Sequence, residues 1–172
     1  MMNNTFLTVI FNSQVLGMGY TDDSVDAVAV ANAFYGRGCA QFCEFHLTDA
    51  MKSFNESLNW KLAALGENDP GLACIFYQMA HVYLQQSEPE EAITCFEEFV
   101  RLQKLDKQRN LQDNAEICYA DGIVAKLRSR GSSGGDDIAL SFFFQALTMF
   151  ETLFGDNHEK VASVLVSPTV QV

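Results

Sequence analysis

The chain has 172 residues, 48% of them hydrophobic and 19% charged, and its 22 acidic and 11 basic side chains give a net charge of −11. This length fits one compact domain or a short repeat array, and the composition is too apolar for a disordered chain. The acidic balance argues against nucleic-acid binding, which needs clustered Lys and Arg, and against binding to an anionic membrane. We also expect no membrane-spanning segment, because no apolar run approaches the roughly 20 residues needed.

Residues 1–23 are predicted to be an irregular or degenerate leading segment. The apolar run at residues 5–11 has no positive flank before it and no clear cleavage site after it, so it does not resemble a secretory signal. The five cysteines are odd in number and show no disulfide spacing. Reduced thiols and a cytoplasmic location are therefore expected.

From residue 24 onward the sequence repeats itself at a spacing of about 42 residues, with small residues matching small ones and bulky residues matching bulky ones in three copies. The second copy carries Ala73, Tyr77, Ala80, Ala92, Ile93, Phe96 and Val100. The first carries Ala31, Tyr35, Gly38, Ala50, Met51, Phe54 and Leu58, and the third carries Ala115, Tyr119, Gly122, Ala139, Leu140, Phe143 and Leu147. Five extra residues in the third copy fall in the Gly/Ser run at 132–136, which predicts a lengthened turn.

This spacing divides the chain into an array over residues 24–165 and a short tail over residues 166–172. The predicted units are repeats at about 24–66, 67–108 and 109–155, followed by a half repeat at 156–165. Within each repeat the apolar residues recur at steps of three and four, which is the period of a helix. Each repeat is therefore predicted to be a pair of helices.

Capping residues support these helices. Asp69 before Pro70 is a predicted N-cap, and Ser87 with Glu90 is a predicted capping box. Other predicted N-caps are Thr48, Asp113 and either Asp136 or Asp137. Gly66 and Gly155 fit the left-handed residue that ends a helix.

Small residues in the middle of each first helix predict close helix crossings. Gly38, Ala80 and Gly122 take this position, and a phenylalanine of the second helix, at 54, 96 or 143, fills the space beside it. One such hairpin is too thin to bury its apolar face alone. Stacked hairpins bury a continuous core, so the sequence predicts a helical repeat array.

These positions resemble the tetratricopeptide repeat. The residues that carry the resemblance are Gly38, Ala50, Phe54 and Ser57, then Ala80, Tyr83, Ala92 and Phe96, then Gly122, Ala139, Phe143 and Ala146. The long repeat spacing and the Leu-Gly border are similar to the long subtype of kinesin light chains. The resemblance implies an all-α, right-handed superhelical solenoid of stacked antiparallel helix hairpins. It also implies a protein-interaction scaffold that binds a peptide or protein in a concave groove lined by the first helices.

The predicted groove follows from the helical period of the first helices. Its residues are Asn32, Tyr35, Cys39, Tyr77, His81, Leu84, Glu116, Tyr119 and Lys126. One tyrosine per repeat forms a ladder. The rings either contact a peptide or pack between neighbouring helices, and the sequence leaves both interpretations open. The basic residues that clamp a chaperone's C-terminal carboxylate in some tetratricopeptide domains are absent at these positions.

Chemistry at the cysteines is disfavoured. Cys39 and Cys43 lie one turn apart near His46, but a fourth zinc ligand is missing. His81 could activate Cys39 as a nucleophile, but no acidic residue that would orient the histidine accompanies them. We therefore expect no catalytic residue, no metal site and no cofactor. The predicted partner is a protein or peptide.

The end of the array suggests an alternative function. The polar capping helix that closes such arrays is not evident. An open end would expose Phe142, Phe143, Phe144 and Phe150 unless the last ten residues cover them. In this alternative the chain is a structural segment of a larger array that self-associates through its uncapped end.

Overall fold

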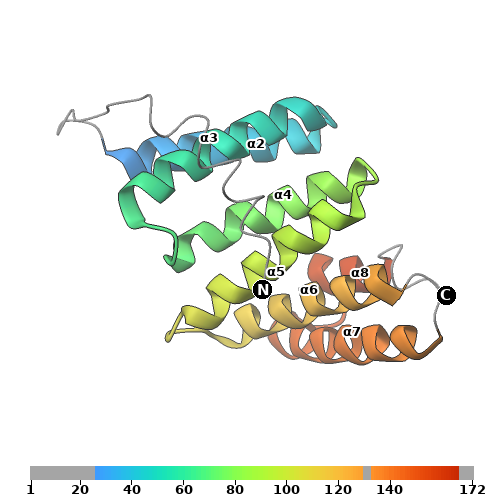
Figure 1. Ribbon diagram of the computed structural model, residues 1–172. Helices are drawn as coiled ribbons and strands as arrows, with labels where there is room; N and C mark the ends of the chain where they lie inside the picture. Colours follow the sequence, from blue (N-terminus) through green and yellow to red (C-terminus); the bar gives the residue numbers. More distant parts are fainter. Residues whose placement is uncertain (1–25, 130–132, 167–172) are drawn as a thin grey trace, which may run out of the picture.

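The computed structural model describes residues 26–129 and 133–166, and every element in these ranges is helical (Figure 1). The prediction of an all-α fold is confirmed. The predicted segment 1–23 and residues 167–172 of the predicted tail lie outside the described residues. The helices are α2 (Ala27–Cys43), α3 (Leu47–Leu65), the 3-10 turn η1 (Pro70–Leu72), α4 (Ala73–Gln85), α5 (Pro89–Leu105), α6 (Leu111–Ser129), α7 (Ser133–Phe154) and α8 (Glu159–Val166).

Consecutive helices pair and the pairs lie in succession. Helix α2 packs on α3, α4 on α5, and α6 on α7. The second helix of each pair then packs on the first helix of the next, α3 on α4, α5 on α6, and α7 on α8. Figure 1 shows the three pairs as successive layers, from α2 and α3 at the top to α6 and α7 at the bottom. One continuous apolar core runs from Ala50 to Val164 through these layers.

A glycine of the first helix meets a phenylalanine of the second in two of the hairpins. A Cβ atom added to Gly38 would lie 2.6 Å from the Phe54 ring, and one added to Gly122 would lie 2.8 Å from the Phe143 ring. In the middle hairpin Ala80 and Phe96 occupy the same positions and are fully buried. The close crossings expected from the small residues are therefore present.

The turns inside the first two hairpins are identical in their backbone hydrogen bonds. The amides at positions 44, 45 and 46 donate to the carbonyls at 40, 42 and 41. In the next hairpin the amides at the equivalent positions 86, 87 and 88 donate to the carbonyls at 82, 84 and 83. Phe45 and Ser87 both adopt a left-handed conformation, with φ of 60° and 61°. Two hairpins of different sequence thus share one backbone geometry at the predicted spacing.

This turn corrects the prediction of a capping box at Ser87. Helix α5 begins at Pro89 with Glu88 as its N-cap, and no side chain caps it. Ser87 lies in the turn instead, with its amide donating to the Leu84 carbonyl. A proline at the first helical position needs no amide acceptor and already has a helical φ, so the helix starts without a capping side chain.

The other capping predictions have mixed outcomes. Asp69 accepts a hydrogen bond from the Gly71 amide at 2.7 Å, and Gly66 and Gly155 have the expected positive φ. Three predicted N-caps are wrong, because the helices begin earlier than their side chains indicated. Thr48 lies inside α3, Asp113 inside α6, and Asp136 and Asp137 inside α7.

Asp113 nevertheless contributes to the start of α6. Its carboxylate accepts from the Asn110 amide at 2.8 Å, while the Asn110 side chain accepts from the Asp113 amide at 3.0 Å. This reciprocal pair is a capping box with Asn110 as the N-cap. The sequence reasoning selected the right motif residue but placed it in the wrong role.

Helix α8 covers part of the C-terminal end of the array. Val161 and Val164 of α8 are buried, as are Phe143 and Phe150 of α7. Phe144 remains 72% exposed. The last described helix therefore covers some of the aromatic surface expected at an open end and leaves the rest uncovered.

Helix α7 also corrects the expectation about membrane-spanning length. Its 19 residues from Asp136 to Phe154 are long and apolar enough to cross a membrane, by length and composition only. One side of the helix packs on α6 through buried residues such as Phe143. The other side carries exposed Ser141, Gln145 and Thr148 among its apolar residues.

Candidate functional site

The three ladder tyrosines form one row across the first helices. Tyr77 on α4 lies within electrostatic range of Tyr35 on α2 and Tyr119 on α6. Each ring also packs against the core phenylalanine of its own hairpin, and all three pairs have ring centroids 5.9 Å apart. The rings therefore belong to the packing of the hairpins. Contact of their edges or hydroxyls with a peptide stays a prediction.

Burial decreases along the row toward α2. Tyr119 is 8% exposed, whereas Tyr77 and Tyr35 are half-buried. Burial raises the pKa of Tyr35 and of Tyr77, so both hydroxyls stay protonated and able to donate. The Tyr35 hydroxyl lies close enough to the side chains of Gln78 on α4 and Cys39 on α2 for both to influence its pKa.

His81 lies one turn beyond Tyr77 on α4. Its ring meets Tyr77 edge-on at 4.6 Å and Phe96 at 5.4 Å between centroids. Burial lowers the pKa of His81 from 6.5 to about 4. The imidazole is therefore neutral at neutral pH and offers one donor and one acceptor nitrogen.

The predicted groove cysteine Cys39 and its neighbour Cys74 sit beside this row. Burial raises the pKa of both thiols. For Cys74 this effect outweighs the ammonium of Lys61, which lies 4.0 Å from its sulfur and donates to the Gly71 carbonyl at 3.0 Å. A raised thiol pKa disfavours the thiolate that a nucleophile or metal ligand requires. Within the described residues, no three His, Cys, Asp or Glu side chains are grouped to hold a metal ion.

Together these residues make a strip whose own side chains are not ionised, which we call the neutral strip. The Lys61 ammonium lies at its edge, 4.0 Å from the Cys74 sulfur, and Glu116 lies near Tyr77. It spans α2 and α4 and consists of Asn32, Tyr35, Cys39, Cys74, Tyr77, Gln78 and His81. Asn32 is exposed, Cys74 is exposed while its sulfur is largely desolvated by its neighbours, and the others are partly buried. The strip offers amide, hydroxyl and imidazole groups in a protein whose net charge is −11.

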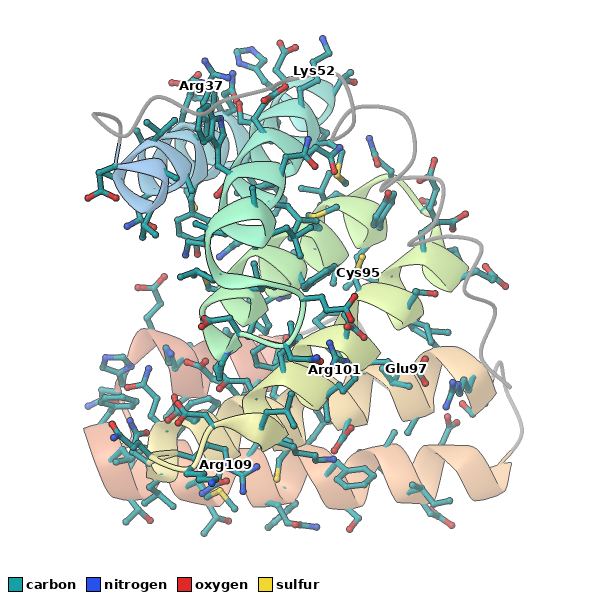
Figure 2. All side chains as sticks on the ribbon, turned by 60° about the vertical axis from the view of Figure 1, so that its left-hand side comes forward. Arg37, Lys52, Cys95, Glu97, Arg101 and Arg109 are labelled. Atoms are coloured by element: carbon teal, nitrogen blue, oxygen red, sulfur yellow. The ribbon has the colours of Figure 1, made fainter. Side chains whose placement is uncertain are left out.

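Charged side chains gather on the second helices. Figure 2 shows Glu97 and Arg101 extending from α5, the second helix of the hairpin whose first helix is α4. Arg101 hydrogen-bonds to Glu98, to Asn68 and to the Glu67 carbonyl, and Glu97 pairs with Arg128 of α6. These contacts connect neighbouring layers of the array.

The remaining predicted groove residues are engaged within the protein. Glu116 pairs with Lys160 of α8 and accepts from Gln112 at 3.0 Å. Lys126 pairs with Asp136 of α7 at 3.0 Å. Leu84 is half-buried against the core. The third repeat thus presents paired charges where the first two present the neutral strip.

Sequence reasoning missed two residues of this surface. Gln78 stands one position after Tyr77, outside the set of positions selected from the helical period, and no amide follows the other two ladder tyrosines to mark the position. Lys160 lies in the half repeat, and no local pattern relates it to Glu116, 44 residues earlier. Only the packing of α8 brings them together.

No protein-family model matches the chain, and the search of curated proteins finds no match.

Proposed function

We propose that the protein is a tetratricopeptide-like interaction scaffold whose hairpins stack into a right-handed superhelical solenoid. Two features support this proposal. The turns of the first two hairpins repeat their hydrogen bonds at the spacing of the sequence repeat, and the Gly38–Phe54 contact recurs as Gly122–Phe143. Equivalent units that contact only their neighbours generate a superhelix when each is rotated slightly against the last.

The proposed activity is binding of an extended peptide along the neutral strip, without catalysis. The observation that carries this proposal is that the seven side chains of the strip are all neutral in an acidic protein, with the Lys61 ammonium only at its edge. Peptide backbone is neutral, and a neutral surface can be desolvated at lower free energy than a charged one. Charge-free donors and acceptors therefore suit recognition of backbone amides and carbonyls.

Individual residues have distinct roles in this proposal. Asn32 and Gln78 each carry a donor and an acceptor that match one peptide group. The Tyr35 hydroxyl lies beside Gln78 and offers a further donor to the same peptide group. The packing of the tyrosine rings on core phenylalanines fixes them before binding, which lowers the entropy lost on association.

The test begins with selection of peptides from a random phage-displayed library on the full chain. The selected peptides are then measured against Asn32→Ala and Gln78→Ala, each of which should weaken binding about fivefold to tenfold, since one hydrogen bond is lost. Tyr83→Phe is the control, because Tyr83 shares α4 but lies near Cys95, Glu88 and Glu91 on the side of the second helix. If the selected peptides bind Asn32→Ala and Gln78→Ala as tightly as the unchanged protein, the strip is not the peptide-binding site.

A second function has one observation in its favour. Phe144 is 72% exposed at the last hairpin, which is consistent with a segment of a larger array that associates through this end. Self-association predicts that the apparent mass in size-exclusion chromatography rises with protein concentration. A constant monomer mass would leave the peptide scaffold as the better proposal.

A further inference from the structure

Each second helix has a row of residues that faces the next hairpin, and we call this row the following face. On α5 it consists of Ile93, Glu97, Val100 and Lys104, at steps of four, three and four. The next helix, α6, engages both charges, because Glu97 pairs with Arg128 and Lys104 lies 3.8 Å from Asp121. Val100 between them is buried.

The internal repeat identifies the same face on the other two second helices. On α3 it consists of Met51, Asn55, Leu58 and Leu62, and on α7 of Leu140, Phe144, Leu147 and Glu151. Leu58 is 1% exposed and the oxygen of the Asn55 side chain is buried. On α7 the equivalent Leu147 is only half-buried, and Phe144 is 72% exposed. The following face is covered on α3 and α5 and is open on α7.

The described part of α8 covers only one end of this face. Arg128, which covers Glu97, lies in the last turn of α6, a helix of 19 residues. Helix α8 has 8 residues, and it meets α7 near Phe150, over which the Lys160 ammonium lies at 5.6 Å. It therefore replaces the first half of a covering helix. The second half, which would lie over Leu140 and Phe144, has no counterpart among the described residues.

The open part of the face has a definite chemistry. Residues 138–150 contain no charged side chain, while Asp137 precedes them and Glu151 follows them on the same side of the helix. Asp137 and Glu151 are both exposed. At 1.5 Å per residue, the two carboxylates stand about 20 Å apart along the axis. An occupant must supply an apolar row and, at one end or both, positive charge.

We propose that the following face of α7 binds an amphipathic α-helix of a partner protein, about three turns long, with basic residues in its last turn. The array supplies the precedent: helices α4 and α6 cover this face in the earlier hairpins, and α6 does so with a basic last turn containing Lys126 and Arg128. On α5 the last turn of the covering helix lies at Glu97, the position of Phe144, through Arg128. The partner helix has the same antiparallel orientation but ends about two turns further along α7, so that its last turn lies beside Asp137. Basic residues there also favour the helix itself, because they lie at the negative end of its dipole.

Charge argues for a foreign helix over the other occupants. A second copy, which the alternative of self-association through this end requires, brings the same acidic ends and a net charge of −11, and this charge disfavours it relative to a basic partner. An anionic membrane is repelled for the same reason. This binding surface is separate from the neutral strip, so either proposal can fail without the other.

The test uses the full chain and a fluorescein-labelled synthetic helix of about 14 residues, with leucines on one face and two arginines in its last turn. A second peptide carries glutamates in place of the arginines. We expect saturable anisotropy with the arginine peptide and at least tenfold weaker binding of the glutamate peptide. Phe144→Glu should weaken binding of the arginine peptide at least tenfold, since it places a charge in the apolar row. Phe45→Glu is the matched control, because Phe45 is 74% exposed on the first hairpin, and it should leave binding unchanged.

A charge reversal makes the test sharper. Asp137→Lys should weaken binding of the arginine peptide and strengthen binding of the glutamate peptide, which a merely sticky surface would not do. Circular dichroism of each variant establishes that it is folded. The proposal is overturned if Phe144→Glu binds normally, or if Asp137→Lys leaves the preference between the two peptides unchanged.

Other occupants give distinct results that also overturn the proposal. If a second copy covers the face, sedimentation detects a dimer that Phe144→Glu dissociates. If residues after Val166 cover it, the arginine peptide binds only a chain ending at Val166. If the face is a membrane surface, the protein sediments with phosphatidylcholine vesicles and Phe144→Glu releases it.

Discussion

His81 shows how burial in the array turns one side chain into a determinant of pH stability. Its pKa falls from 6.5 to about 4 because the ring is enclosed by Tyr77 and Phe96. The folded state therefore binds fewer protons than the unfolded state between these two values. The contribution of His81 to the free energy of unfolding is fully present above about pH 6.5 and is lost as the pH falls toward 4.

Between pH 7 and pH 5 we expect His81 to lower the free energy of unfolding by about 2 kcal/mol. Urea unfolding of the wild type and of His81→Gln at both pH values measures this contribution as the difference between the two proteins. The carboxylates are common to both, so they cancel. Equal pH dependence in the two proteins would mean that His81 does not titrate in this way.

Asn55 is a second residue with an energetic consequence. Its side-chain oxygen is buried on the following face of α3, and no donor among the described residues reaches it. An unsatisfied buried acceptor costs about 1 to 3 kcal/mol. We expect Asn55→Leu to raise the free energy of unfolding by about 1 kcal/mol in urea titrations. Asn55→Asp should lower it, because it buries a charge at the same place, and a stabilising aspartate would contradict this account.

At the scale of a single helix, two glycines of α2 make opposite predictions. Gly36 has no atom within 4 Å of an added Cβ, whereas the Cβ of an alanine at Gly38 would lie 2.6 Å from the Phe54 ring. Gly36→Ala should stabilise the protein by about 0.5 to 1 kcal/mol through helix propensity. Gly38→Ala should destabilise it by about 1 to 3 kcal/mol, because the crossing must widen.

Thermal and urea unfolding of the two variants test this pair directly. Each serves as the control for the other, since both replace glycine by alanine in one helix two residues apart. Gly122→Ala should behave as Gly38→Ala does, because Phe143 occupies the equivalent position. Similar stabilities for Gly36→Ala and Gly38→Ala would show that the close crossing of α2 and α3 does not require a glycine at position 38.

For the whole molecule, a stack of units that contact only their neighbours predicts graded protection. The hairpin of α4 and α5 has a neighbour on each side, whereas α2 and α8 lie at the two ends of the described stack. Hydrogen exchange followed by mass spectrometry should therefore be slowest in α4 and α5 and fastest in α2 and α8. Uniform protection over residues 27–166 would indicate a single cooperative bundle in place of an array.

The extent to which sequence predicted this protein differs from element to element. Helix periods, the regular repeat spacing and the glycine–phenylalanine crossings are local or periodic patterns, and the structure contains them. Helix starts were less predictable: Thr48 and Ser87 have capping chemistry, but His46 and Glu88 are the N-caps. The left-handed conformation at Phe45 and Ser87, which no sequence preference announces, sets where both second helices begin.

The neutral strip and the open face illustrate the same division at the level of sites. The amino-acid sequence by itself determined the repeat and the ladder of tyrosines, because positions that are buried at a regular spacing carry similar residues at that spacing. Only the tertiary structure decided that Gln78 joins Tyr35, that Lys160 pairs with Glu116, and that Phe144 stays uncovered. These facts depend on how neighbouring hairpins and α8 pack against each other, and that packing is not encoded in any local run of residues.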